Sequence, residues 1–380
     1  MTCLNLLQET SNKSYKIMQT DTITSEVLKK LENLPQVKKA CFIEKDGETI
    51  ICLIPEITAI DLPEGIKEAK MPNGQEVYYL SEGEVEFFYE DIFNNETYFK
   101  GSVTINPGDF IIDIGANVGF FSMFVSQQFP NCEVLAFEPA PPIYDALTLN
   151  VLKNQLPVSI RNFGLSDREG SFEFTYYPHS SGFSTFHGNH EEEKELMTSV
   201  IKNQLDSNDP DAQILLEQAE LIAEYKLQKQ TYQCQANTLS AVIREEGIDR
   251  IDLLKVDVEK SELPVLKGIA KEHWNIIKQV VVEVHDIDGT LNEVLNLLQS
   301  NGFKTETKKD PILENTVMTT VFAVNSDFEL GVTSGSDEKR IAGELSNDLL
   351  AKLPEVEKLK ELLPEPDSST TIKWVTGILD

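Results

Sequence analysis

The sequence contains few cysteines and no long apolar run. Its 380 residues include five cysteines, at positions 3, 41, 52, 132 and 234, with no Cys-x-x-Cys pair. Such a sparse, odd-numbered set predicts buried or free thiols rather than a disulfide framework. The longest apolar runs, such as Phe110–Ile114 and Val280–Val282, are far shorter than the roughly 20 residues that a membrane-spanning helix needs. The first thirty residues carry no signal-peptide pattern. We therefore expect a cytoplasmic protein without membrane spans.

Positive charge is also scarce. There are 33 Lys and Arg residues against 63 Asp and Glu, which gives a formal net charge of −30. A surface of this sign repels polyanions, so the composition disfavours nucleic acids and anionic membranes as partners. Hydrophobic residues make up 41% of the chain, which is enough for one large domain with appendages.

The middle of the chain alternates apolar runs with helical patterns, as βαβ units with a largely parallel sheet do. Helical patterns lie near 119–129, 142–153, 261–271 and 289–300. The apolar runs predict strands at 109–114, 133–138, 158–163, 251–257 and 279–285, followed by a pair at 302–309 and 318–325. The sequence thus predicts an α/β fold with a mostly parallel seven-stranded sheet, to which the final pair adds an antiparallel strand at the edge.

The segments around and within this core have a different character. Residues 1–75 combine a helical pattern with two apolar runs that flank a hairpin signal at Lys45-Asp46-Gly47, which predicts a small N-terminal α+β segment before a core at 76–325. Residues 178–235 are polar, acidic and helical in pattern, and predict a lid or partner-docking insert. Residues 326–380 predict a helical tail, with a charged helical pattern around 345–363 that Pro354 breaks.

The strongest motif is FIIDIGANVG, an apolar strand that ends in Asp113 and runs through Gly115 and Asn117 into a helix at Gly119. Such a βα turn lies at the carboxyl edge of the sheet, where open α/β folds bind their ligands. Glu138 ends the next strand, 19 residues after Gly119, close to the roughly 20-residue offset at which an acid meets ribose hydroxyls. We therefore predict that Glu138 binds a ribose.

The turn differs from the G-x-G-x-x-G of dinucleotide-binding proteins. Asn117 takes the place of the second glycine, which lets the backbone touch a pyrophosphate, and this disfavours NAD and FAD. S-adenosylmethionine has no phosphates, and it offers a cationic amine and sulfonium that Asp113 can favour directly or through water. The alternative is structural: Asp113 caps the turn, and Gly115 and Gly119 only permit tight packing.

Acids and a histidine end the fourth and fifth strands of the predicted sheet. Asp257 and Glu259 share a face at the end of one strand, and Glu283 and His285 share a face at the end of the other. With an unperturbed pKa of about 6.5, His285 suits a general base that takes a hydroxyl proton. One alternative is a Mg²⁺ site, disfavoured because histidine is an uncommon ligand for this ion. The other is that these acids only solvate the strand ends.

Several further polar residues are weaker candidates. Asn162 ends the third strand and is predicted to reach the adenine, and Tyr98 is predicted to close over the cofactor or to belong to the core. The insert holds His179, His187 and His190 without an obvious fourth metal ligand, so we expect a polar loop there rather than a metal site.

These motifs resemble those of the FkbM-type methyltransferases, in the O-methyltransferase branch associated with polyketide synthases and nonribosomal peptide synthetases. The resemblance covers about residues 84–325 and rests on "EDIFNNETYFKGSVTINPGDFIIDIGANVGFFS", "VLAFEPAPP", "NFGLSDREGSFEF", "LLKVDVEKSELPVLKGI" and "VVVEVHDIDGTL". It implies a Rossmann-like class I methyltransferase fold, S-adenosylmethionine as methyl donor and a hydroxyl as acceptor. The acceptor is commonly part of an intermediate tethered to an acyl or peptidyl carrier protein. The rival functions are methylation of a free sugar hydroxyl, a carboxylate or an amine, and a catalytically silent docking module that still binds the cofactor.

A second resemblance concerns the N-terminal segment. "LKKLENLPQVKKACFIEKDGETIICLIPE" is similar to the small C-terminal subdomain of adenylation enzymes, but "LLPEPDSSTTIKW" lacks the context of that subdomain's catalytic lysine. We therefore expect a remnant or a docking element. Because carrier proteins are usually acidic, the net charge of −30 predicts long-range repulsion of a carrier unless basic side chains gather around the cleft.

Overall fold

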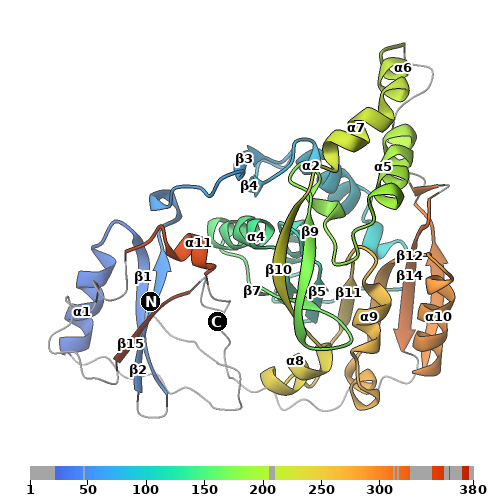
Figure 1. Ribbon diagram of the computed structural model, residues 1–380. Helices are drawn as coiled ribbons and strands as arrows, with labels where there is room; N and C mark the ends of the chain where they lie inside the picture. Colours follow the sequence, from blue (N-terminus) through green and yellow to red (C-terminus); the bar gives the residue numbers. More distant parts are fainter. Residues whose placement is uncertain are drawn as a thin grey trace.

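A seven-stranded sheet forms the centre of the computed structural model, which describes residues 22–45, 48–204, 210–310, 313–314, 316–325, 345–354, 359 and 370–375. The strand order is β13-β14-β12-β11-β5-β6-β7 (Figure 1). The strands are β5 (Phe110–Ile114), β6 (Glu133–Phe137), β7 (Val158–Arg161), β11 (Leu253–Val256), β12 (Gln279–His285), β13 (Phe303–Lys308) and β14 (Met318–Asn325). The predicted Rossmann-like α/β fold is confirmed.

The final strand pair closes one side of this sheet. All strands run parallel except β14, which is antiparallel to both β12 and β13. The antiparallel strand therefore lies one place in from the edge, and β13 forms the edge itself. This order arises because helix α10 (Thr290–Ser300) carries the chain past one strand position, and β14 then returns into the gap.

Helices cover both faces of the sheet. Successive strand residues point to opposite faces, so Ile111 and Ile112 of β5, both fully buried, belong to two different apolar clusters. Helices α3 (Phe120–Gln128) and α4 (Pro141–Asn154) contribute to the first cluster. Helices α8 (Leu239–Glu246), α9 (Glu262–Lys267) and α10 contribute to the second, with the 3₁₀ segment η5 (Lys271–Ile276). The central strands are buried on both faces, which explains their continuous apolar sequences.

A second, three-stranded sheet carries the predicted insert. Its order is β8-β10-β9, with β8 (Gly164–Leu165), β9 (Gly170–Tyr176) and β10 (Gln230–Asn237). The chain between β9 and β10 forms η4 (Ser181–Phe183), α5 (His190–Gln204), α6 (Pro210–Glu217) and α7 (Ala219–Lys226). The insert is thus helical in its middle, while the sheet that supports it was not predicted.

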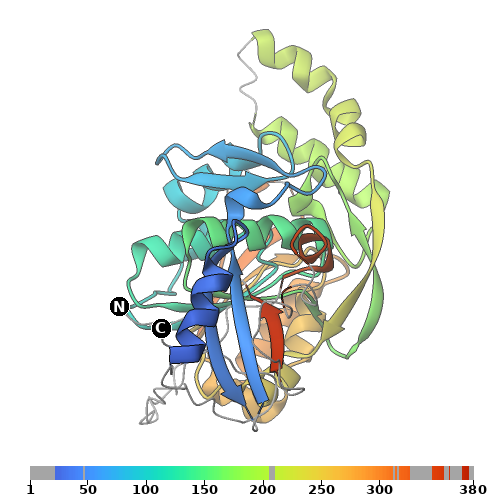
Figure 2. The ribbon, with the colours of Figure 1, turned by 90° about the vertical axis from the view of Figure 1, so that its left-hand side faces the viewer.

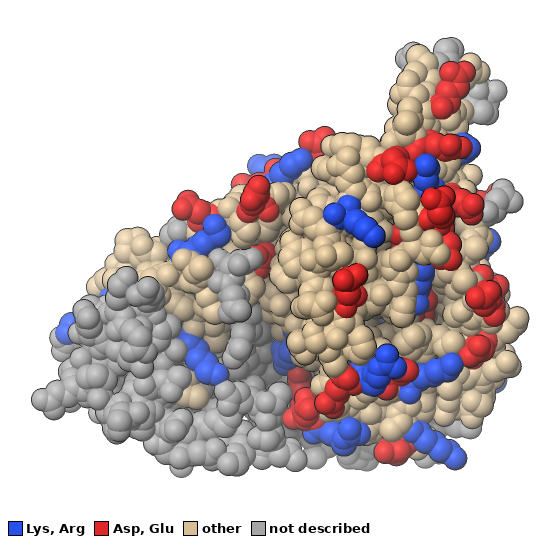
Figure 3. Space-filling view, viewed as in Figure 1, with Lys and Arg blue, Asp and Glu red and all other residues tan. Residues whose placement is uncertain are grey.

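Helices α6 and α7 project from the body of the molecule as an arm (Figures 1 and 2). The arm exposes apolar side chains, among them Ile214 with 57% and Leu221 with 73% of their surface accessible. Acidic side chains lie along the arm and over α5 in the view of Figure 3. None of the described helices has the length and apolar character needed to cross a membrane.

The N-terminal segment and the tail share a small sheet. Helix α1 (Thr22–Glu32) precedes the hairpin β1 (Val37–Lys45) and β2 (Glu48–Pro55), and β15 (Thr370–Trp374) pairs with β2 in parallel (Figure 2). The predicted hairpin is present, although Asp46 and Gly47 of its turn lie outside the described residues. In the described part, the helical pattern expected at 345–363 corresponds to the short helix α11 (Asn347–Leu350) and to a helical position at Leu359, and strand β15 was not expected.

The segment that joins this sheet to the core leads into the site. It contains η1 (Ile57–Ala59), the hairpin β3 (Lys67–Lys70) and β4 (Glu76–Tyr79), α2 (Glu84–Phe88), the π-helical turn η2 (Tyr89–Asn94) and η3 (Thr97–Phe99). Tyr78 and Asn150 of α4 exchange two hydrogen bonds between the Tyr78 backbone and the Asn150 amide, at 2.7 and 2.8 Å. This contact holds the joining segment against the core.

Candidate active site

A cavity of about 320 Å³ lies where the carboxyl ends of the central strands meet the insert and the segment from α2 to η3. Seven of the residues nominated from the sequence line it: Tyr98, Gly115, Asn117, Glu138, Asp257, Glu259 and Glu283. The described residues of its wall do not include Asp113, Gly119, Asn162 or His285. The predicted location at the carboxyl edge of the sheet is therefore the location of the cavity.

The βα turn after β5 has a backbone that side chains would obstruct. Gly115 has a φ of 76°, and a Cβ added to it would lie 1.8 Å from the carbonyl oxygen of Asp257. Asn117 also has a positive φ, of 49°. Gly119, with a φ of 97°, packs against Leu147 of α4, which a Cβ would approach to 2.7 Å. Gly115 thus lets the turn approach β11 at the cavity wall, whereas Gly119 serves helix packing.

Glu138 presents a braced carboxylate to the cavity. It is only 4% exposed, and its two oxygens accept hydrogen bonds from the backbone N–H groups of Asn117 at 3.1 Å and Ala140 at 3.0 Å. Burial raises the pKa of Glu138 to about 7. Each carboxylate oxygen can accept a second bond, so Glu138 retains the capacity to accept from two ribose hydroxyls.

Asp113 lies behind the turn rather than on the cavity wall. It is fully buried, accepts a hydrogen bond from the Ser122 hydroxyl at 2.8 Å, and pairs with the ammonium of Lys255 at 3.1 Å. Lys255 stands directly opposite Asp113 on the neighbouring strand β11 and also donates to the carbonyl oxygen of Gly115 at 2.9 Å. Asp113 therefore supports the turn from the side away from the cavity. This arrangement agrees with the structural alternative, in which Asp113 serves the turn itself.

Lys255 links this support to the cavity wall. Its ammonium lies 3.5 Å from Asp257 and 5.3 Å from the centre of the Tyr98 ring. The Tyr98 hydroxyl donates to Asp257 at 2.7 Å, and burial, followed by the charge of Asp257, raises the pKa of Tyr98 well above its usual value. Lys255 was not nominated from the sequence, although a lysine in the apolar strand LLKV is a signal of a buried charge pair.

Carboxylates dominate the charge of the cavity. Its lining residues include eight acids (Glu82, Glu84, Asp91, Glu138, Asp257, Glu259, Glu283 and Asp310) and one base, Lys226. Burial, then the charges of Asp257 and Glu259, raise the pKa of Glu283 well above its usual value. Burial also raises the pKa of Asp91 to about 6. Such a cavity favours a cationic ligand.

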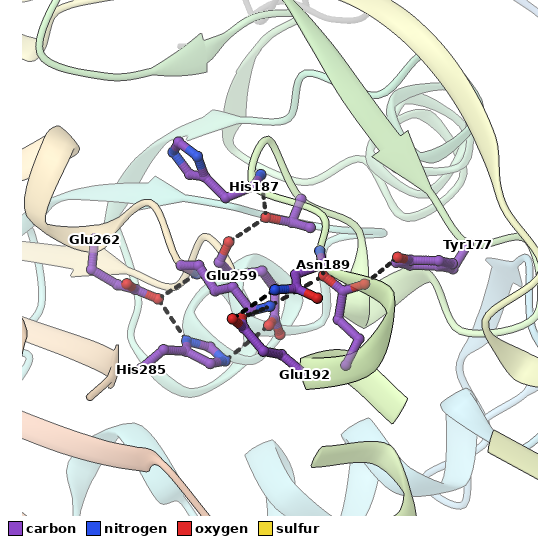
Figure 4. Close-up of polar contacts among 10 residues, drawn as sticks. Tyr177, His187, Asn189, Glu192, Glu259, Glu262 and His285 are labelled. Atoms are coloured by element: carbon purple, nitrogen blue, oxygen red, sulfur yellow. Dashed lines mark hydrogen bonds and ion pairs between the residues drawn. The ribbon is translucent and has the colours of Figure 1, made fainter. Parts of the chain in front are cut away.

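His285 is next to the cavity but does not line it. Its side chain is fully buried at the end of β12, with Nδ1 at 2.8 Å from a Glu262 oxygen and Nε2 at 3.1 Å from a Glu259 oxygen (Figure 4). Burial alone would lower the pKa of His285, but Glu259 and Glu262 raise it well above its usual value. Glu259 does line the cavity, so it lies between the ring and any ligand there. Glu262 was not nominated from the sequence.

The remaining nominated residues have structural partners. The Asn162 amide donates to the backbone carbonyl of Glu138 at 3.0 Å and so braces that strand end. In the insert, His179 stacks on Tyr225 with 4.5 Å between ring centres, and His190 contacts Glu224 at 3.1 Å. Within the described residues, no group of three or more His, Cys, Asp or Glu side chains is arranged to hold a metal ion.

The insert and helix α2 complete the wall next to the turn. The buried Ser181 hydroxyl donates to Glu84 at 2.9 Å and accepts from the Asn117 amide at 3.1 Å. Neither Ser181 nor Glu84 was nominated from the sequence, because the fold brings them to the turn from distant positions. The rest of this wall is mainly apolar, with Phe87, Phe88, Phe183, Met197 and Val200 among its members.

The residues present fit S-adenosylmethionine. Glu138 suits the ribose, the apolar side chains suit the adenine, and the carboxylates suit the cationic groups. The turn lacks the second glycine, which a pyrophosphate would require.

Comparison with known proteins gives matches over the same part of the chain. Residues 113–305 match the model of the methyltransferase FkbM domain. The chain is 35% identical over 252 residues to the 31-O-demethyl-FK506 methyltransferase FkbM of Streptomyces tacrolimicus, covering 66% of this chain and 94% of that protein. It is 34% identical over 236 residues to the methyltransferase sdnD of Sordaria araneosa, covering 60% and 85%.

A further relative is much longer than this chain. The AMB antimetabolite synthetase AmbE of Pseudomonas aeruginosa is 32% identical over 315 residues, which cover 78% of this chain but only 15% of the synthetase. Because the family model matches half of the chain and the chain covers nearly all of the Streptomyces protein, the chain belongs to the FkbM methyltransferase family.

Proposed function

We propose that this methyltransferase transfers a methyl group from S-adenosylmethionine to a hydroxyl group of a polyketide or nonribosomal peptide intermediate. One observation carries the proposal: a single cavity has a braced ribose-type carboxylate, Glu138, on its wall together with the carboxylates Asp257, Glu259 and Glu283. When bound, S-adenosylmethionine supplies a methyl group on a positively charged sulfur.

The residues of the chain would hold the cofactor from two sides. Glu138 would accept hydrogen bonds from the ribose hydroxyls, and the backbone of Gly115 and Asn117 would lie against the nucleoside. Asp257, fixed by the Tyr98 hydroxyl at 2.7 Å, offers negative charge to the cationic groups. The main work of such a site is to hold the acceptor oxygen within roughly 3–3.5 Å of the methyl carbon.

An alcohol becomes a good nucleophile only when its proton is removed, and a carboxylate in the cavity is suited to accept that proton. Because Glu259 lines the cavity and contacts Nε2 of His285 at 3.1 Å, we assign the proton transfer to Glu259. Its pKa is raised by burial, which makes it a stronger base than an ordinary glutamate. His285, which the sequence nominates as the base, then acts through Glu259. Glu259 would take up the proton that the acceptor hydroxyl loses.

The nature of the acceptor is supported by the family. The name of the Streptomyces relative describes methylation of an oxygen, and the Pseudomonas relative is named as a synthetase. We infer that the acceptor of this chain is likewise a hydroxyl of a natural product under assembly, presented on an acyl or peptidyl carrier protein.

The experiment combines cofactor binding with an acceptor comparison. The chain is titrated with S-adenosylmethionine by calorimetry and then incubated with β-hydroxyacyl groups on a carrier protein, the same groups as free thioesters, and amine analogues. We expect saturable binding in the calorimeter and O-methylation that is faster on the carrier, with carrier-bound products read by intact-protein mass spectrometry and free thioesters by small-molecule mass spectrometry. Binding without methylation of any acceptor would identify a silent docking module, and N-methylation would identify an amine acceptor.

A further inference from the structure

Glu262 is a buried acid that does not line the cavity, yet it contacts two residues that shape it. Glu262 is the first residue of α9 and is 1% exposed. One of its oxygens accepts hydrogen bonds from His285 Nδ1 at 2.8 Å and from the backbone N–H of Lys260 at 2.9 Å (Figure 4). The carboxylate therefore joins the end of β12 to the turn that follows β11.

That turn has a backbone conformation that needs support. Glu259 and Lys260 have φ values of 45° and 69°, in the left-handed region that residues other than glycine rarely adopt. The carbonyl oxygen of Glu259 accepts a hydrogen bond from the Thr185 hydroxyl. The Lys260 side chain is only 8% exposed. Its ammonium pairs with Glu192 at 2.9 Å and with Glu193 at 3.3 Å, both at the start of α5. The insert thus holds the turn from one side and Glu262 from the other.

The charges around His285 come from several elements. Glu259 and Glu262 contact its two ring nitrogens. Asp257 and Glu283 are the other acids close to Glu259, whereas the positive charge of Lys260 is directed to the two acids of α5. The ring therefore lies between carboxylates, and one of them, Glu262, is out of reach of a ligand in the cavity.

We propose that Glu262 is a positioning residue for methyl transfer: it fixes the His285 ring with its hydrogen on Nδ1, so that Nε2 faces Glu259, and it holds the turn that presents Glu259 to the acceptor. The role of Glu259 in this statement rests on the proposed function. The orientation of His285 does not, and it can be measured without turnover.

The first measurement uses the wild-type chain. Nitrogen chemical shifts of the His285 ring are followed by NMR across a pH titration. We expect a midpoint above the ordinary value of about 6.5 and a hydrogen on Nδ1 throughout. A midpoint at or below that value, or a ring protonated only on Nε2 when neutral, would overturn the proposal.

The second measurement uses Glu262→Gln, which keeps the shape of the side chain and removes its charge. We expect the His285 midpoint to fall by about one unit or more, as it does when an opposite charge is removed. Turnover should fall by roughly a hundredfold, the pH profile of turnover should move, and S-adenosylmethionine binding should stay unchanged. Glu262→Asp keeps the charge, so its His285 midpoint should lie closer to that of the wild type. If Glu262→Gln does not fold, the His285 midpoint and turnover of Glu262→Asp are compared with those of the wild type instead.

Glu293→Gln is the matched control. Glu293 lies on α10 with 59% of its side chain exposed and pairs with Lys267 at 3.0 Å, so the same chemical change there should alter neither the midpoint nor turnover. If Glu262→Gln only loses stability while its midpoint and pH profile match the wild type, Glu262 merely starts helix α9 and the proposal fails. If the midpoint moves but no acceptor is methylated by the wild type, the proposed function fails and the positioning of His285 stands.

Discussion

Lys255 is the residue whose surroundings most depend on its charge. The Lys255 side chain is only 3% exposed, and its ammonium lies between Asp113 and Asp257. Two carboxylates, the ring of Tyr98 and the carbonyl oxygen of Gly115 lie around this cation. Lys255 therefore connects the turn after β5 to Asp257 on the cavity wall.

We expect Lys255→Met to destabilise the folded chain by about 3–5 kcal/mol, because it leaves a buried carboxylate without its partner. The free energy of unfolding in urea measures this change. Lys267→Met provides the control, since Lys267 forms an exposed pair with Glu293 and its removal should change stability by less than about 0.5 kcal/mol. Equal effects of the two substitutions would show that the buried network is not what holds the turn.

We expect Glu138 to make cofactor binding depend on pH. Its pKa is 4.5 as an ordinary glutamate and about 7 in the folded chain, because of burial. The folded state thus binds more protons between these values, and this group's contribution to stability falls as the pH rises from the lower value to the upper. Ribose hydroxyls donate to the ionised carboxylate, so we expect affinity for S-adenosylmethionine to rise as the pH passes through about 7. Calorimetry in buffers of different ionisation enthalpy should detect the released proton.

Glu138→Gln tests the same group by substitution. The amide cannot accept both backbone N–H groups that the carboxylate accepts, and it loses a charge-assisted bond to the ribose. We expect affinity to fall roughly ten- to hundredfold and its pH dependence near neutrality to disappear. A variant that binds with unchanged affinity would remove Glu138 from the cofactor site.

The βα turn between β5 and α3 depends on a close approach of its backbone to the end of β11. Gly115→Ala would bring a Cβ to 1.8 Å from the Asp257 carbonyl oxygen, whereas Gly108, with a similar φ of 82°, has no atom within 4 Å of an added Cβ. We expect Gly108→Ala to cost about 1–2 kcal/mol, the penalty of the left-handed conformation. Gly115→Ala should cost more and abolish cofactor binding. Denaturation and calorimetry on the pair separate backbone strain from the steric clash.

The elements of the central sheet could be predicted from the sequence because their burial leaves a direct signal. Strands such as FIIDI and VVVEVH are buried on both faces, and their apolar runs match the observed β5 and β12 closely. Strand β10, QTYQCQAN, is largely polar and half exposed, so its pattern was read as part of the helical insert. Among the described strands, β15 pairs with β2, more than three hundred residues away in sequence, a contact that no local pattern reveals.

Part of the lining of the candidate site could be predicted in the same way. Glu138, Asp257 and Glu283 were nominated because parallel strands bring their carboxyl ends to one edge of the sheet, and all three line the cavity. The directions of the side chains could not be predicted. Asp113 and His285 also end strands, yet each is turned toward a buried partner, Lys255 or Glu262. Their partners follow from packing between elements, which a single sequence does not record.

The charge of the whole molecule bears on the proposed carrier protein. The formal net charge is −30, so at an ionic strength near 0.1 M an acidic carrier is repelled once it comes within about 10 Å of the surface. We expect the association rate of a carrier-bound acceptor to increase as salt screens this repulsion, and that of an uncharged free thioester to stay constant. Stopped-flow measurements over a salt series distinguish the two. A rate that falls with salt would indicate a local basic surface at the docking site.

The pairing of β15 with β2 has a consequence for synthesis on the ribosome. The β1–β2 hairpin is translated before the central sheet, whereas the strand that covers the other edge of β2 is translated after it. Until then the nascent chain carries an open strand edge, to which a neighbouring chain on the same messenger could add. Completing this sheet is therefore a late event, and conditions that delay translation of residues 370–374 should favour misassembly over the finished fold.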